Sequence, residues 1–187
     1  MKILNFFKVT VLVIALFANQ SITAQEKTKM VGGAEMYPSK NIVQNAVNSK
    51  DHTTLVAAVK AADLVGVLSS KGPFTVFAPV NKAFDKLPEG VVESLLKPEN
   101  KMKLQTILKY HVVAGKWSAN ELAKLIKDEG GKVSLETASG EKITAWMKGK
   151  NVYISDANGG KAKVTITDVN QSNGVIHVIN SVLLPKS

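Results

Sequence analysis

The sequence predicts an α+β domain in which a layer of short helices covers a mostly antiparallel β-sheet. Apolar residues recur at helical spacing through the first two thirds of the chain and alternate with a period of two through the last third. One early strand interrupts the helical part, because the run Phe74–Ala78 is rich in aromatic and β-branched residues. Helices and strands that are separated along the chain in this way are typical of α+β folds.

The helices are expected to be short, since proline, glycine and capping residues recur at close intervals. Gly72-Pro73 and Pro88 end helical stretches, because proline lacks the backbone donor. Ser118 and Glu121 predict a capping box, in which each side chain bonds to the other residue's backbone amide. The expected helices span residues 41–48, 53–62, 63–69, 81–87, 89–96, 100–110 and 118–127.

The last third of the chain is expected to form most of the sheet. Its strands span residues 133–137, 142–147, 151–155, 163–169 and 175–184, and glycines at 140, 149, 159 and 160 supply turns between them. Pro79 closes the early strand because it cannot donate to a strand ladder. The sequence contains no internal repeat, and 187 residues suffice for one domain with its own core.

The composition excludes several classes of function. Without cysteine, the chain can form neither a disulfide nor a thiolate metal site. All 24 basic residues are lysine, and arginine supplies the planar fork that reads phosphates and bases. We therefore expect no specific nucleic-acid binding. The net charge of +9 either attracts acidic surfaces or simply keeps the protein soluble.

The first 24 residues have the pattern of a signal peptide. Lys2 and Lys8 supply the positive start, 9–18 is apolar, and a polar stretch ends at the small residue Ala24. About ten apolar residues are too few to cross a bilayer. We therefore expect a signal peptide at 1–24, a flexible lead at 25–36, a domain at 37–187, no membrane span, and export to the periplasm, the cell surface or the medium.

Three ordered motifs resemble those of the fasciclin domain family. The segment 74–84, Phe-Thr-Val-Phe-Ala-Pro-Val-Asn-Lys-Ala-Phe, is similar to the first family signature, and 173–185 is similar to the second. Tyr110-His111 lies between them and resembles the family's Tyr-His element. Val80 stands where the family usually has Thr, and Asn180 stands where it usually has Asp. Because Val80 lacks a hydroxyl that could cap the helix that follows, we expect Asn81 to cap it.

The resemblance implies a wedge of two small, mostly antiparallel sheets covered by a layer of short helices. It also implies a role in adhesion, extracellular matrix or surface interaction, with no general catalytic activity and no cofactor. The residues themselves offer no His-x-x-x-His or His-Glu pair, so we expect no metal site. Tyr110 and His111 would contact a partner, with His111 at or just below the surface. The remaining motif positions are expected to be mainly structural; they are Phe74, Thr75, Phe77, Ala78, Pro79, Asn81, Phe84, Asp168, Asn173, Gly174, Ile176, His177 and Pro185.

The histidines and tryptophans carry further expectations. His177 stands in a strand that is apolar on both faces, which predicts a buried histidine bonded within the core. His52 lies beside a helix start and is expected to be a surface or capping residue. Asp168 is expected to end a strand and order the turn at 170–173. Trp117 and Trp146 are expected to pack, although either ring can stack on a sugar.

A non-catalytic binding module is the function that these observations favour. Its partner would be a protein, a polysaccharide or another cell-surface component, and we expect a monomer. A carrier or sensor of a small hydrophobic ligand is the alternative, which requires a deep apolar pocket. A hydrolase is the third hypothesis; it needs His177 at an open cleft with Asp168 and a serine, Ser172 or Ser181.

Overall fold

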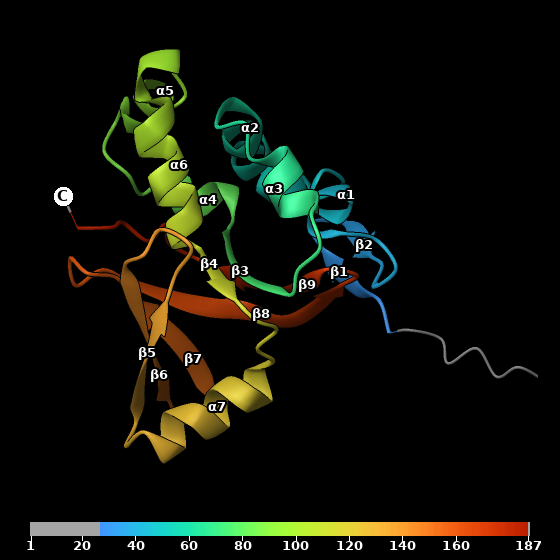
Figure 1. Cartoon of the computed structure of the whole chain (residues 1–187), viewed down its shortest axis with the longest axis vertical. Helices are drawn as coiled ribbons and strands as arrows, with labels where there is room; N and C mark the ends of the chain where they lie inside the picture. Colours follow the sequence, from blue (N-terminus) through green and yellow to red (C-terminus); the bar gives the residue numbers. More distant parts are fainter. Residues whose placement is uncertain (1–26, 187) are drawn as a thin grey trace, which may run out of the picture.

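The computed structural model describes residues 27–186, and its core is one strongly bent sheet (Figure 1). Seven strands lie in the order β4-β3-β9-β8-β7-β6-β5, and every neighbouring pair is antiparallel except the parallel pair β3–β9. The strands are β3 (Phe74–Pro79), β4 (Val112–Ala114), β5 (Lys132–Glu136), β6 (Lys142–Lys148), β7 (Asn151–Ser155), β8 (Lys161–Gln171) and β9 (Gly174–Ile179).

The two halves of this sheet are joined through the long strand β8. Its first residues pair with β7, while Val164–Gln171 pairs with β9 across two register shifts. Register shifts increase local twist, so the sheet bends along β8. The two ends of the sheet then come together, because a bridge joins Val113 of β4 to Thr137, the residue that follows β5. The expected α+β class is confirmed, and its two small sheets are the two halves of this bent sheet.

A β-hairpin stands where a flexible lead was expected at 25–36, so that expectation is wrong for the described residues from 27 onward. The hairpin pairs β1 (Lys29–Val31) with β2 (Ala34–Met36). Val31 and Met36 are buried against the sheet, and this apolar burial holds the hairpin to the domain. The predicted signal peptide and its cleavage site lie outside the described residues.

The helices form a layer on one side of the sheet, with one exception. They are α1 (Ile42–Ala46), α2 (Thr53–Ala61), α3 (Val65–Ser69), α4 (Asn81–Phe84), α5 (Val91–Leu95), α6 (Lys101–Tyr110) and α7 (Ala119–Asp128), with 3₁₀ turns η1 (Lys50–His52) and η2 (Pro98–Asn100). Helix α7 lies apart at the opposite end of the molecule, beside β5 and β6 (Figure 1). The predicted capping box of Ser118 and Glu121 begins it and is confirmed.

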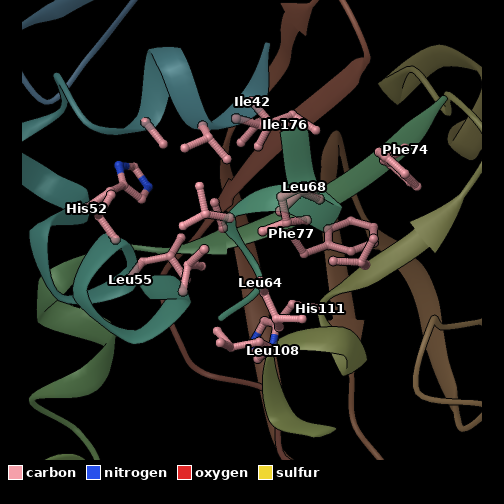
Figure 2. A pocket seen from close by; sticks show the side chains of 18 of the residues that line it. Ile42, His52, Leu55, Leu64, Leu68, Phe74, Phe77, Leu108, His111 and Ile176 are labelled. Atoms are coloured by element: carbon pink, nitrogen blue, oxygen red, sulfur yellow. The ribbon is translucent and has the colours of Figure 1, made fainter. Parts of the chain in front are cut away.

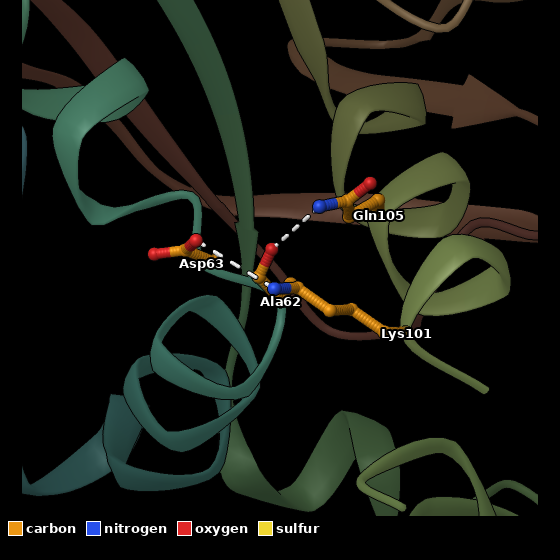
Figure 3. A network of polar contacts seen from close by, with 4 residues as sticks. All are labelled: Ala62, Asp63, Lys101 and Gln105. Atoms are coloured by element: carbon orange, nitrogen blue, oxygen red, sulfur yellow. Dashed lines mark hydrogen bonds and ion pairs between the residues drawn. The ribbon is translucent and has the colours of Figure 1, made fainter. Parts of the chain in front are cut away.

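Helices α2 and α6 are tied together where α2 ends. The Gln105 side chain donates a hydrogen bond of 2.8 Å to the carbonyl of Ala62, and Lys101 lies 3.6 Å from the Asp63 carboxylate (Figure 3). Asp63 has a φ of 58° and separates α2 from α3, at the boundary between the helices expected at 53–62 and 63–69. The exposed ion pair adds little stability, so the buried apolar side chains of this layer hold it.

The core has an inner part enclosed by the bent sheet and α7 and an outer part beneath the helices. Phe77 is fully buried in the inner part, and Ile176 and Val178 are buried beneath the helices, as the sequence predicts. Phe84 is only half-buried, because it follows the strand on the short helix α4 and not within the sheet. Among residues 27–186, no helix combines the length and apolar character that a membrane crossing needs.

Candidate functional site

Tyr110 anchors the end of α6 inside the core. Its ring is fully buried, and its hydroxyl donates to the carbonyl of Lys142 at 2.9 Å and accepts from the amide of Ala157 at 3.0 Å. Burial raises the pKa of this hydroxyl. Tyr110 thus connects α6 to β6 and to the turn after β7, and it presents no surface to a macromolecule.

His111 is buried as well, so its expected position near the surface is wrong. Its Nδ1 donates to the carbonyl of Ile107 at 2.8 Å, and its Nε2 accepts from the amide of Leu183 at 3.0 Å. Burial is the main reason that its pKa falls to about 4, against the opposing effect of the Ile107 bond. The imidazole is therefore neutral at neutral pH, and both nitrogens are occupied. The Tyr110-His111 pair joins elements of the core, and its burial does not support contact with a partner.

His177 is buried, as predicted. Its Nε2 donates to the Trp117 carbonyl at 2.8 Å, its Nδ1 accepts from the Asp168 amide at 3.3 Å, and its ring stacks on Phe77. Burial lowers its pKa. A general base needs access to a substrate proton, so this histidine does not support the hydrolase hypothesis.

Asp168 has a different role from the one expected. It lies within β8 at a φ of 52°, in the region of the register shifts, and not at the end of a strand. Its carboxylate accepts a hydrogen bond of 2.7 Å from the amide of Ala119, the first residue of α7. A carboxylate is favourable at a helix N-terminus, so Asp168 fixes α7 to the sheet.

Two motif asparagines connect separate elements through their side chains. Asn173 accepts from the amide of Ile42 at 3.0 Å and donates to the carbonyls of Leu68 and Ser70, each at 2.9 Å. Asn81 does not cap α4, whose N-cap is Val80. Instead its side chain accepts from the amide of Thr54 in α2 at 3.0 Å, and it caps that helix from outside.

The other motif positions form the centre of the sheet and its margins. A Cβ at Gly174 would collide with the Phe74 carbonyl, so glycine lets β3 and β9 approach. The Thr75 hydroxyl donates to the Gly115 carbonyl, and the Pro185 carbonyl accepts from the Asn158 side chain. The buried positions are Thr75, Phe77, Ala78, Pro79, Gly174, Ile176 and His177; the half-buried ones are Phe74, Asn81, Phe84, Asp168, Asn173 and Pro185.

The outer face of strands β5 to β8 presents a different chemistry. Register places Lys132, Trp146, Tyr153 and Lys163 directly across from one another on four adjacent strands. All four are exposed or half-buried, because the alternate residues of each strand fill the core. We call this set, together with Lys161, the outer-face row.

The aromatic pair at the centre of the outer-face row is ordered. The rings of Trp146 and Tyr153 stack with centroids 4.7 Å apart, and the Trp146 indole N–H donates to the Ser155 hydroxyl at 2.9 Å. The ammonium of Lys161 lies 5.9 Å from the centre of the Trp146 ring. Trp117, by contrast, packs against the inner core, as expected.

The lysines of the outer-face row are not neutralised by carboxylates. Within residues 27–186, the single ion pair is the one between Lys101 and Asp63, in the helical layer. Lys132, Lys161 and Lys163 therefore keep their charges available to an anion. No sequence motif distinguishes these lysines or Tyr153, although the alternating pattern of each strand places them on its polar face. In this same part of the chain, no three histidines or carboxylates are grouped to hold a metal ion.

Comparisons with known proteins agree with the motifs. The family described as "Fasciclin domain" matches residues 50–185. The Synechocystis protein sll1483 is 49% identical over 160 residues, which cover 86% of this chain and 82% of that protein. Immunogenic protein MPB70 of Mycobacterium bovis is 34% identical over 145 residues, covering 75% of this chain and 66% of that protein. Human periostin is 33% identical over 146 residues, covering 78% of this chain and 16% of periostin.

A solved structure shows the same fold. It is a FAS1 domain pair from the insect cell adhesion molecule Fasciclin I, with a TM-score of 0.69 and 22% identity. The match covers 78% of this chain and 51% of that chain. At this identity the likeness supports the architecture alone, and the wedge of sheet and helices that the motifs imply is confirmed.

Proposed function

Because the chain belongs to the fasciclin domain family, we propose that it is an exported, non-catalytic binding module that holds an acidic polysaccharide on its outer-face row. The observation that carries the proposal is the alignment of Lys132 and Lys163 on either side of the stacked Trp146–Tyr153 pair. Acidic sugars combine a negative charge with apolar ring faces, and the row combines ammonium groups with aromatic carbon.

Adhesion as the purpose of this binding rests on the family and on the structural neighbour, which is named as a cell adhesion molecule. Export rests on the signal-peptide pattern of the first 24 residues. The absence of catalysis is consistent with His111 and His177, whose ring nitrogens are bonded within the core. A monomer with one such face is sufficient for attachment.

Lysine is suited to a flexible, repeating anion. An ammonium binds as a point charge with three rotatable donors, whereas arginine favours a fixed bidentate partner. Exposed charges of this kind attract a polyanion over about 10 Å at 0.1 M salt, and added salt screens them. The proposal therefore predicts salt-sensitive binding of acidic polymers and weak binding of neutral ones.

Binding of the exported protein to immobilised polygalacturonate and to dextran, measured at increasing NaCl, tests the proposal. We expect binding to polygalacturonate that weakens with salt and no comparable binding to dextran. The triple variant Lys132→Gln/Lys161→Gln/Lys163→Gln should weaken binding at least tenfold. The control Lys82→Gln/Lys97→Gln/Lys103→Gln removes the same charge from exposed positions on the helical side of the molecule and should change binding by less than threefold.

Equal losses of polygalacturonate binding in the two triple variants would contradict the proposal, because binding would then depend on the net charge of the protein and not on the outer-face row. Binding of a cell-surface protein in place of any acidic polysaccharide would contradict it too.

A further inference from the structure

The chain contains two Asn-Gly dipeptides, Asn158-Gly159 in the turn between β7 and β8 and Asn173-Gly174 in the turn between β8 and β9. An asparagine side chain reacts most readily with the backbone amide that follows it when the next residue is glycine, because no Cβ hinders the approach. The structure places the two dipeptides in opposite environments.

Asn158-Gly159 is open to solvent. Both residues are exposed, and a Cβ at Gly159 would meet no atom within 4 Å. The Gly159 amide donates a long hydrogen bond, of 3.3 Å, to the Asp156 carbonyl. Exposed connecting segments of this kind are the more mobile parts of a domain, so the Asn158 side chain can approach the Gly159 amide.

Asn173-Gly174 is held in place by the fold. The Asn173 side chain forms three hydrogen bonds, to the backbone of Ile42 and to that of residues 68 and 70. Gly174 is buried, and β3 lies so close that an added Cβ would collide with the Phe74 carbonyl. The Asn173 side chain can react with the Gly174 amide only after all three of its bonds break, so folding protects this dipeptide.

The bonds of Asn173 also hold the helical layer over an apolar cavity of about 140 Å³ between that layer and the sheet (Figure 2). Ile42 and Leu68, whose backbones bond to Asn173, line this cavity. His52, which was expected to be a surface or capping residue, is buried beside it. Movement of Asn173 would therefore disturb the core, which adds to the protection of this dipeptide.

Asn158 fastens the C-terminal segment to the turn between β7 and β8. Its side chain donates to the carbonyl of Leu184 at 3.2 Å and to that of Pro185 at 2.9 Å. Asp156, in the same turn, accepts from the Leu184 amide at 3.1 Å. The turn thus holds this segment through both its amide and its carbonyl groups.

We propose that Asn158 is a site of spontaneous deamidation and that the reaction unfastens residues 184–186 from the domain. The Gly159 amide gives its proton to hydroxide, and its nitrogen then attacks Cγ of Asn158. The new C–N bond closes a cyclic imide, the bond from Cγ to Nδ2 breaks, and Nδ2 takes a proton from water and leaves as ammonia. Water then opens the imide at either of its carbonyls, which produces aspartate or isoaspartate.

The product cannot form the two bonds of Asn158. An ionised carboxylate only accepts hydrogen bonds, so it has no donor for the carbonyls of Leu184 and Pro185 and repels both oxygens. Leu183 should stay in place, because it is fully buried and its amide is bonded to His111. Unfastening is therefore confined to the residues that follow Leu183.

Mass spectrometry of the exported protein, incubated at pH 8.5 and 37 °C and then digested with trypsin, measures the reaction. Peptide 151–161 contains Asn158, peptide 164–186 contains Asn173, and fragment ions assign each modified position. In the folded protein Asn158 should react at least tenfold faster than Asn173. In concentrated urea the protection of Asn173 is lost, and the difference should fall below threefold.

Hydrogen exchange measured by NMR tests the structural consequence. Asn158→Asp reproduces the aspartate product, and exchange at the Leu184 amide should accelerate at least tenfold while that at Leu183 changes less than threefold. Asn151→Asp is the matched control, because it adds the same charge at an exposed position of β7. It should change neither amide. Asn158→Gln has a longer side chain that closes the imide poorly, so its exchange at Leu184 should not change with incubation.

Reaction of Asn158 no faster than that of Asn173 in the folded protein would overturn the modification site. Equal exchange at Leu184 in Asn158→Asp and the parent would overturn the unfastening of the C-terminal segment.

Discussion

The amide of Leu183 donates a hydrogen bond of 3.0 Å to Nε2 of His111, across 72 positions of sequence. The same ring donates from Nδ1 to the Ile107 carbonyl, in the last turn of α6. One neutral imidazole therefore joins the end of α6 to the C-terminal segment, and protonation of Nε2 would break the bond from the Leu183 amide.

The free energy of unfolding is predicted to decrease as the pH is lowered through the range where free histidine titrates. Burial lowers the pKa of all three histidines, that of His111 to about 4. The unfolded chain takes up these protons near pH 6.5 and the folded chain does not, so the free energy of unfolding decreases as pH falls from 6.5 toward 4. His111 alone accounts for roughly 3 kcal/mol of this decrease, at about 1.4 kcal/mol per pKa unit. Urea denaturation at pH 7, 5.5 and 4.5 measures it.

The variant His111→Gln is the control for that measurement, because Gln does not titrate. Its decline between pH 7 and 4.5 should be smaller than that of the parent. A parent protein with constant stability over this range would contradict the prediction.

Tyr110 and His111 are predicted to stabilise the folded protein. Tyr110→Ala should cost about 3–5 kcal/mol, because it leaves a cavity in the inner core. His111→Ala should cost about 2–4 kcal/mol, because the Leu183 amide and Ile107 carbonyl each lose a partner. Tyr110→Phe keeps the ring and should cost only about 1 kcal/mol. Chemical denaturation compares the three, and a His111→Ala protein as stable as the parent would show that its bonds are dispensable.

Phe77 and Phe84 lie seven residues apart in one motif and should respond differently. Phe77→Ala should cost about 3–5 kcal/mol, because the ring is fully buried and stacks on His177. Phe84→Ala should cost less than half as much, because its ring is half-buried on α4. Thermal melting distinguishes them, and equal losses would be inconsistent with this difference in burial.

Asn173→Ala is predicted to loosen α1 and α3 together. The change removes three hydrogen bonds to Ile42, Leu68 and Ser70 and should cost about 2 kcal/mol. Hydrogen exchange should accelerate at amides of α1 and α3 and stay unchanged in α7. The exposed neighbour Ser172 supplies the control, and Ser172→Ala should leave exchange unchanged.

Cleavage after Ala24 is predicted for the exported protein, which would begin at Gln25. Its intact mass, measured after export, decides the point. Recovery of the uncleaved chain, Met1 to Ser187, from the membrane would contradict the prediction.

Local and periodic signals in the sequence determined the class of fold and much of the core. The capping box of Ser118 and Glu121 depends on residues three positions apart, and it forms as predicted. The apolar run at 175–179 predicted a strand buried on both faces, and β9 lies between β3 and β8 in the sheet. These outcomes were predictable because a capping pattern or a hydrophobic period is complete within one element.

Tertiary structure alone decided the positions of the polar groups that matter for function. His111 is buried because a segment 72 residues away covers it, and His52 is buried because its turn faces β3 and the adjacent cavity. Lys132, Trp146, Tyr153 and Lys163 became neighbours through the register of four strands. A single sequence does not specify the register of paired strands or the burial of a polar side chain, because both arise from contacts between segments that are distant along the chain.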